Sequence, residues 1–158
     1  MQIALILHAM EKLNLPGYSF RIKSALQRNL IFDEIRKKYV PLTPEEWVRQ
    51  HFIHYLIAEK NYPRSHISVE LNLKLNKLNK RCDIVIFNNQ GAAQLIVECK
   101  SPSVQITQNV FDQIAVYNLK LSVKYLIVTN GMNHYCCVID KSGNSYRFIS
   151  EIPDYKNM

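Results

Sequence analysis

Long apolar runs, cysteine motifs and acidic residues are all scarce in this chain of 158 residues. No apolar run approaches the roughly 20 residues that a membrane-spanning helix needs, so we expect no membrane association. The apolar opening, residues 1–10, has neither a basic leader nor a small-residue cleavage site, so we expect no signal peptide. The sequence also has no internal repeat and no low-complexity tract.

Cysteine is limited to four residues that form no C-x-x-C pair. They fall inside strand-like apolar runs: Cys82, Cys99, Cys136 and Cys137. Buried, reduced thiols of this kind suit the cytoplasm, which is the predicted location. The five histidines are scattered, and neither they nor the cysteines make up a zinc ligand set.

Acidic residues are outnumbered, because 13 Asp and Glu face 20 Lys and Arg, a formal net charge of +7. The excess favours a polyanionic partner, and a solvated basic surface explains it equally well. One basic cluster lies just before Asp83, where a phosphate backbone running past a metal site needs cations. Its members are the candidate DNA-binding residues Lys74, Lys77, Lys80 and Arg81.

The composition is that of an ordinary globular protein, with 47% hydrophobic and 21% charged residues. The length suits one domain with a real core, so we expect a single domain over residues 1–158. Residues 1–13 are candidates for a disordered segment or for a stretch that precedes the true start.

Charged side chains interrupt two apolar runs that read as neighbouring strands. "RCDIVIF" contains Asp83, and "LIVECK" contains Glu98 and Lys100. Side chains two residues apart on a strand share a face, so Glu98 and Lys100 must point the same way. A strand-surface ion pair or a turn-capping aspartate would be the ordinary explanation, but the apolar neighbours indicate burial. Buried charge is costly unless it is paired or holds a metal.

Carboxylates in this arrangement suit Mg²⁺, with Mn²⁺ as a substitute, because hard cations prefer oxygen ligands. Asp83 and Glu98 would bind the metal, and the backbone carbonyl of Cys99 could add one more oxygen. A bound metal polarises a phosphoryl oxygen and activates water. Lys100 would orient that water and stabilise charge on the phosphate. The predicted reaction is hydrolysis of a phosphodiester.

Hydrophobic periodicity predicts an α/β domain. The clearest helix starts at an N-cap, Thr43, with Pro44 in the first position and Glu46 completing a capping box. A strand over residues 66–75 alternates strictly, which places Ile67, Val69, Leu71, Leu73 and Leu75 on one face. Further elements are predicted over residues 81–87, 93–100, 106–121 and 123–131. The order αβββαβ implies a mixed central sheet flanked by helices, with a small N-terminal strand pair (residues 18–33) and a C-terminal hairpin (residues 134–150).

An Asp on one strand followed by E-x-K on the next resembles the signature of the PD-(D/E)XK nuclease superfamily. From "LTPEEWVRQHFIHYLI" to "EIPDY" the chain is similar to the N-terminal nuclease domain of type I restriction enzyme R subunits. The resemblance implies a restriction-endonuclease-like fold in which Asp83, Glu98 and Lys100 are catalytic. Cys82 stands where the name-giving Pro of the superfamily would be.

The same resemblance implies roles for two helices. Gln113 and Tyr117 match a Q-x-x-x-Y motif, and residues four apart share a helix face, so they could hold DNA and the site geometry. An ordinary surface position and a core aromatic explain them without function. Glu46 matches an acidic residue that often adds a metal contact from the first helix, and its capping role explains it equally well.

R subunits carry a motor after this domain, whereas this sequence contains no G-x-x-x-x-G-K-[ST] motif. The leading hypothesis is therefore a stand-alone, Mg²⁺-dependent nuclease domain that acts on DNA. The alternative is a non-catalytic DNA-binding or assembly module with the same fold. The partners that either reading implies are DNA, a second copy of the chain, and separate motor or specificity subunits.

Overall fold

The computed structural model describes residues 10–75, 78–140, 142 and 145–158. A small antiparallel sheet comes first, in the order β1-β2-β3 (Ile22–Ala25, Arg28–Asp33, Lys38–Pro41). A six-stranded sheet follows in the order β4-β5-β6-β7-β8-β9, and it is mixed because β6 and β7 pair in parallel. Its strands are Ile67–Leu75, Leu78–Phe87, Ala93–Cys99, Tyr125–Thr129, His134–Ile139 and Tyr146–Ile149.

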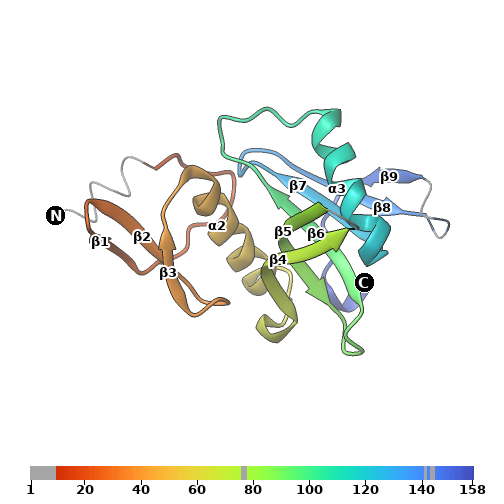
Figure 1. Ribbon diagram of the computed structural model, residues 1–158, viewed down its shortest axis with the longest axis horizontal. Coiled ribbons are helices and arrows are strands. Elements are labelled where there is room, and N and C mark those ends of the chain that lie inside the picture. Colours follow the sequence, from red (N-terminus) through yellow and green to blue (C-terminus); the bar gives the residue numbers. More distant parts are fainter. Residues whose placement is uncertain (1–9, 76–77, 141, 143–144) are drawn as a thin grey trace.

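The described ranges also contain the α-helices α2 (Pro44–Ala58) and α3 (Gln108–Leu121), with short 3-10 turns at Arg64–His66 and Tyr155–Asn157. Helix α2 lies between the two sheets, and α3 covers the large sheet on its other face (Figure 1). None of the helices in the described ranges is long and apolar enough to cross a membrane.

The predicted α/β class and αβββαβ order are confirmed, with two local corrections. The N-terminal strand pair is a three-stranded sheet, because Lys38–Pro41 adds a strand too short and too basic to show an apolar pattern. The strand predicted over residues 81–87 is longer, because β5 begins at Leu78. Residues 1–9 and 76–77 lie outside the described residues, whereas Leu13 is buried in the core.

The core has two parts. The α2-side core packs α2 and the small sheet on one face of the large sheet, and its buried members include Ile31, Val48, Phe52, Ile84 and Val97. The α3-side core packs α3 on the opposite face, with Cys82, Val85, Ile96, Ile114 and Val128 among its members. All four cysteines are free and buried, as predicted.

The apolar side chains of β4 change from one side of the large sheet to the other midway along the strand. Ile67 and Val69 pack with the α2-side core, whereas Leu71 and Leu73 pack with the α3-side core. Glu70, between them, has φ 53, a left-handed conformation that is uncommon for a residue with a side chain. The prediction that these alternate residues share one face is therefore wrong. The alternation misleads because the side chains change sides of the sheet at Glu70, so each face of the strand is apolar along only part of its length.

Strand β5 makes the same switch beside it. Cys82 belongs to the α3-side core and Ile84 to the α2-side core, although the two are separated only by Asp83. Val69 pairs with Ile84 and Leu71 with Cys82, which puts Glu70 opposite Asp83. Irregular strand positions of this kind are often found beside active sites.

The turn between β7 and β8 depends on a glycine. Gly131 has φ +81, and a Cβ there would lie 2.7 Å from Leu13 Cδ2 and 3.0 Å from Val48 Cγ2. We expect Gly131→Ala to lower the free energy of unfolding by about 1–3 kcal/mol, through backbone strain and crowding. Urea denaturation measures this. Gly17→Ala is the control, because nothing lies within 4 Å of its Cβ position; equal effects of the two changes would contradict the prediction.

Candidate functional site

Asp83, Glu98 and Lys100 meet at the end of the β5–β6 strand pair. Glu98 is 8% exposed, and its Oε1 accepts a hydrogen bond of 2.8 Å from Lys100 Nζ. Asp83 is also 8% exposed, and its Oδ2 accepts a hydrogen bond of 2.7 Å from the backbone N–H of Cys99. The carboxylate of Asp83 thus reaches the strand that carries Glu98 and Lys100. The three groups predicted to share a pocket lie together.

Glu98 is affected by its burial and by the charge of Asp83. Burial, and then the charge of Asp83, raise the pKa of Glu98 to about 7, although Lys100 lowers it. Burial alone would lower the pKa of Lys100, but its hydrogen bond to Glu98 and the nearby carboxylates raise it. Glu98 Oε2 is buried without a hydrogen-bond partner in the described part of the chain. The site therefore holds an acceptor that lacks a cation or a proton.

A buried arginine from α2 contacts Asp83. Arg49 Nη2 donates to Asp83 Oδ1 at 2.8 Å and to Glu45 Oε1 at 3.1 Å, and Nη1 donates to Glu46 Oε2. Its side chain is only 4% exposed. Burial alone would lower the pKa of Arg49, but the carboxylate of Asp83 and its other acidic neighbours raise it. Arg49 is therefore a permanent cation on one side of the site.

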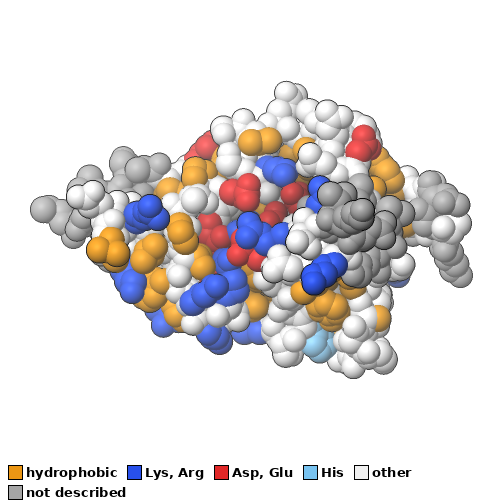
Figure 2. All heavy atoms as spheres, in the orientation of Figure 1, with side chains coloured by type: hydrophobic (Ala, Val, Ile, Leu, Met, Phe, Trp, Pro, Cys, Tyr) orange, Lys and Arg blue, Asp and Glu red, His pale blue; other side chains and the backbone are white. Residues whose placement is uncertain are grey.

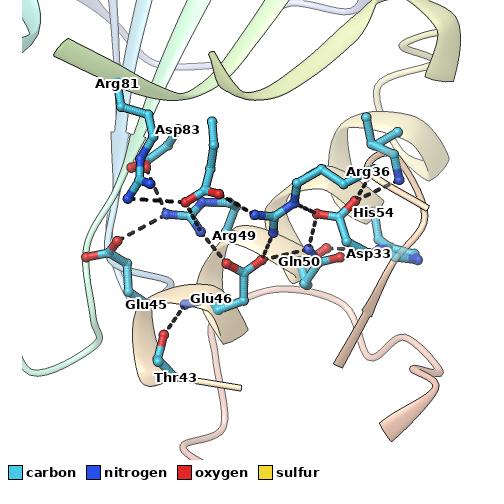
Figure 3. A network of polar contacts seen from close by, with 12 residues as sticks. Asp33, Arg36, Thr43, Glu45, Glu46, Arg49, Gln50, His54, Arg81 and Asp83 are labelled. Atoms are coloured by element: carbon cyan, nitrogen blue, oxygen red, sulfur yellow. Dashed lines mark hydrogen bonds and ion pairs between the residues drawn. The ribbon is translucent and has the colours of Figure 1, made fainter. Parts of the chain in front are cut away.

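A second arginine connects the small sheet to this site (Figure 3). Arg36 donates to Asp33 at 2.6 Å, to Glu46 at 2.5 Å and to Glu70 at 2.6 Å. Asp33 Oδ1 also accepts from the backbone N–H of Arg36, which holds the turn after β2 in place. Burial alone would raise the pKa of Asp33, but these contacts with Arg36 lower it. Glu70, at the left-handed position of β4, is thus fixed by charge.

Acids outnumber bases in this cluster. Four cations, Arg36, Arg49, Arg81 and Lys100, face six carboxylates: Asp33, Glu45, Glu46, Glu70, Asp83 and Glu98. Full ionisation would leave two negative charges, which one divalent cation would balance. No three His, Cys, Asp or Glu side chains converge as metal ligands within the described ranges. Two carboxylates and a strand carbonyl still fit Mg²⁺, which keeps several waters.

Glu46 does not form the predicted capping box. Thr43 Oγ1 accepts from the backbone N–H of Glu46 at 3.0 Å, so the N-cap is confirmed. The Glu46 carboxylate turns away from the helix start and accepts from Arg36, Arg49 and Gln50 instead. Its metal contact stays a prediction, although each of its oxygens already has a partner.

Glu45 is the acid of α2 that lies nearer the catalytic candidates. Burial and the charge of Asp83 raise the pKa of Glu45, while Arg49 and Lys100 lower it. Its side chain is 45% exposed, so it stands at the open side of the site. Sequence reasoning missed Glu45 and Arg49. The i, i+4 spacing of these two residues on a helix was the signal that could have indicated a pair.

The other predicted residues are Gln113, Tyr117 and the basic group before Asp83. Gln113 is exposed on α3, and within the described residues its side chain makes no hydrogen bond to the site. The side chain of Tyr117, and the whole of Lys77, lie outside the described residues. Lys74 and Lys80 are exposed, and Arg81 is 60% exposed with one contact to Glu70 at 3.4 Å.

Comparison with known proteins identifies the family of this chain. Residues 44–153 match the family described as the type I restriction enzyme R protein N terminus (HSDR_N). The chain belongs to this family. A search of curated protein sequences found no match.

A solved structure has a similar fold. It is a fragment assigned as an HsdR subunit of a type I restriction enzyme from Vibrio vulnificus YJ016, with a TM-score of 0.51 and 19% sequence identity. The match covers 71% of this chain and 24% of the other, so this chain spans about a quarter of that relative. At this identity the likeness concerns the fold alone.

The raised pKa of Glu98 predicts a pH dependence in metal-free buffer. Between pH of about 4.5 and about 7 the folded chain keeps a proton that the unfolded chain loses, so stability falls as the pH rises. The slope is at most about 1.4 kcal/mol per pH unit. Urea denaturation in EDTA at several pH values measures it. Glu98→Gln, which cannot ionise, is the control, and an unchanged slope in that variant would contradict the prediction.

Removing Arg49 leaves buried carboxylates without their cation. We expect Arg49→Met to cost about 3–5 kcal/mol of stability, the range for breaking a buried pair. Adding Asp83→Asn to Arg49→Met should recover part of that loss, which a double-mutant cycle measures. Arg64→Met is the control, because Arg64 is 54% exposed and lies 3.9 Å from Glu34. Strictly additive effects of Arg49 and Asp83 would show that the pair is not coupled.

Proposed function

We propose that this chain is a Mg²⁺-dependent nuclease domain of the PD-(D/E)XK type that hydrolyses DNA phosphodiesters. The observation that carries the proposal is the pairing of Glu98 and Lys100 beside Asp83, with Glu98 Oε2 buried and unpartnered among the described residues. A carboxylate oxygen without a donor suits a metal ligand. Membership of the R-subunit family supports the reaction class.

Each residue of the site would have one task. Asp83 and Glu98 would hold the metal, with the Cys99 carbonyl as a further ligand. When bound, Mg²⁺ supplies Lewis acidity at the phosphoryl oxygen and acidifies water. Lys100 stays protonated, because its acidic neighbours raise its pKa, so it serves as a charge and a donor. It would orient the attacking water and stabilise negative charge on the phosphate.

The α2 residues would hold this arrangement in place. Arg49 fixes one oxygen of Asp83, which leaves the carboxylate a single orientation. Glu45, on the open side, could contact the metal through a water or accept a proton from the nucleophile. Gln113 and Tyr117 would hold DNA from α3, and Lys74, Lys77, Lys80 and Arg81 would contact its phosphates.

One observation favours the second candidate, a DNA-binding or assembly module without catalysis. Both oxygens of Asp83 already accept hydrogen bonds, from Arg49 and from the Cys99 N–H. If Arg49 takes the place of a metal at Asp83, that carboxylate is neutralised without an ion. The chain would then serve to bind DNA, to pair with a second copy of itself, or to join separate motor or specificity subunits.

Plasmid cleavage in Mg²⁺ separates these two functions. We expect wild-type protein to nick or linearise DNA and Lys100→Ala to lose roughly 10²-fold or more of the rate, as when a charge-stabilising donor is removed. Lys124→Ala, an exposed lysine outside the site, should cleave like wild type. Titration calorimetry with Mn²⁺ should show binding that Glu98→Ala abolishes. Equal background cleavage by wild type, Lys100→Ala and Lys124→Ala, with no metal binding, would contradict the nuclease proposal. It would favour the DNA-binding or assembly module.

A further inference from the structure

The small sheet carries more positive charge than its size requires. Residues 21–41 contain six Lys and Arg against two acids, which is +4 of the chain's formal +7. The family match begins at residue 44, so this sheet lies outside it. Its buried side, with Ile22, Ile31 and Val40, accounts for its packing on α2. Apart from Arg36, which pairs with Glu46 of α2, the basic residues of the sheet are not needed for that packing.

A groove runs from this sheet to the candidate site. Lys38 and Tyr39 of β3 line one wall, Arg81 of β5 lines the other, and the groove continues to Glu45 and Arg49. Its volume is about 410 Å³. On the molecular surface, acidic side chains gather in the middle of this face, with Lys and Arg beside them toward the small sheet (Figure 2). The groove therefore connects a basic surface to the carboxylates.

The basic side chains of the groove differ in how far carboxylates of the protein already neutralise them. Arg36 at its base is fully engaged by three carboxylates. Lys38 is exposed and has no ion pair with any described residue. Arg81 has one contact, at 3.4 Å. Lys38 and Arg81 therefore present charge from opposite walls to a ligand between them.

The outer face of the small sheet extends this charge. Lys23 Nζ lies 3.9 Å above the ring of Tyr39, and the guanidinium of Arg21 lies 3.7 Å above the ring of Phe32. The two rings meet edge to face at 5.1 Å. Cation–π contacts of this kind hold long side chains in place. Tyr39 also lines the groove, so its ring connects the groove to the ammonium group of Lys23.

We propose that the small sheet is a DNA-backbone clamp for the strand that enters the site. Lys38 of β3 and Arg81 of β5 hold phosphates within the groove, and Lys23, above the Tyr39 ring, holds a further phosphate beside it. The inference rests on the proposed function, because it names where the substrate lies. Contacts to phosphate position a duplex without reading its sequence, so the clamp predicts sequence-independent binding.

Charge reversal in the clamp tests this proposal. Binding of a fluorescein-labelled DNA duplex is measured by anisotropy in EDTA, where metal-dependent cleavage cannot occur, over a range of salt concentrations. We expect Lys38→Glu to weaken binding about tenfold or more. The slope of log affinity against log salt should become shallower by about 0.9 for each phosphate that the variant no longer neutralises. Lys38→Gln should release the phosphate without reversing charge, and Lys38→Arg should retain both affinity and slope.

Lys124→Glu is the matched control. Lys124 is exposed and also lies over an aromatic ring, 5.0 Å from the centre of Tyr125, but it lies outside the groove. Equal reductions of affinity in Lys38→Glu and Lys124→Glu would overturn the proposal, because net charge alone would explain them. So would tighter binding of an RNA duplex or an acidic peptide than of DNA.

Failure of the clamp and failure of the nuclease give different results. If wild type cleaves DNA and Lys38→Glu retains its affinity and salt slope, the clamp is wrong and the nuclease stands. If wild type does not cleave, yet Lys38→Glu weakens binding and Lys124→Glu does not, the clamp stands without catalysis. Circular dichroism melting of each variant confirms that the small sheet remains folded.

Discussion

Neutralisation of crowded carboxylates is the constraint on which the rest of this structure depends. Arg36 and Arg49 join acids from the small sheet, α2 and the β4–β5 pair at one place. Without these guanidinium groups the three elements would repel one another where they meet. Breaking a buried pair of this kind leaves an uncompensated charge. Glu98, close to Asp83, pairs through one oxygen with Lys100, and its other oxygen is buried with no hydrogen-bond partner among the described residues.

Much of this arrangement could be predicted from local patterns. Asp83, Glu98 and Lys100 stood out because each interrupts an apolar run, and such an interruption requires a compensating partner. Thr43 and Pro44 marked the start of α2 because helix starts depend on a few neighbouring residues. The order of helices and strands followed from periodicity, which also needs only local information. Features that depend on neighbours in sequence were therefore the predictable ones.

Features that depend on distant residues were not predictable. Arg36 and Arg49 neutralise acids 10 to 34 positions away, and no spacing rule reports such pairs. Glu46 has the spacing of a capping box, but two strong cations compete for its carboxylate and win. The face switch at Glu70 was hidden because the apolar and polar residues of β4 alternate without a break through the position where the backbone becomes left-handed. Each miss is a tertiary contact that outweighs a local preference.

The left-handed turn of the backbone at Glu70 has a consequence for how the β4–β5 hairpin can assemble. Side chains beyond it face one core and those before it face the other, so sliding the strands by a single residue would bury polar groups at both ends at once. A misaligned pairing of β4 with β5 therefore costs free energy in both cores, on opposite sides of the sheet. The register that aligns β4 with β5 is therefore also the register that places Asp83 beside Arg49 of α2.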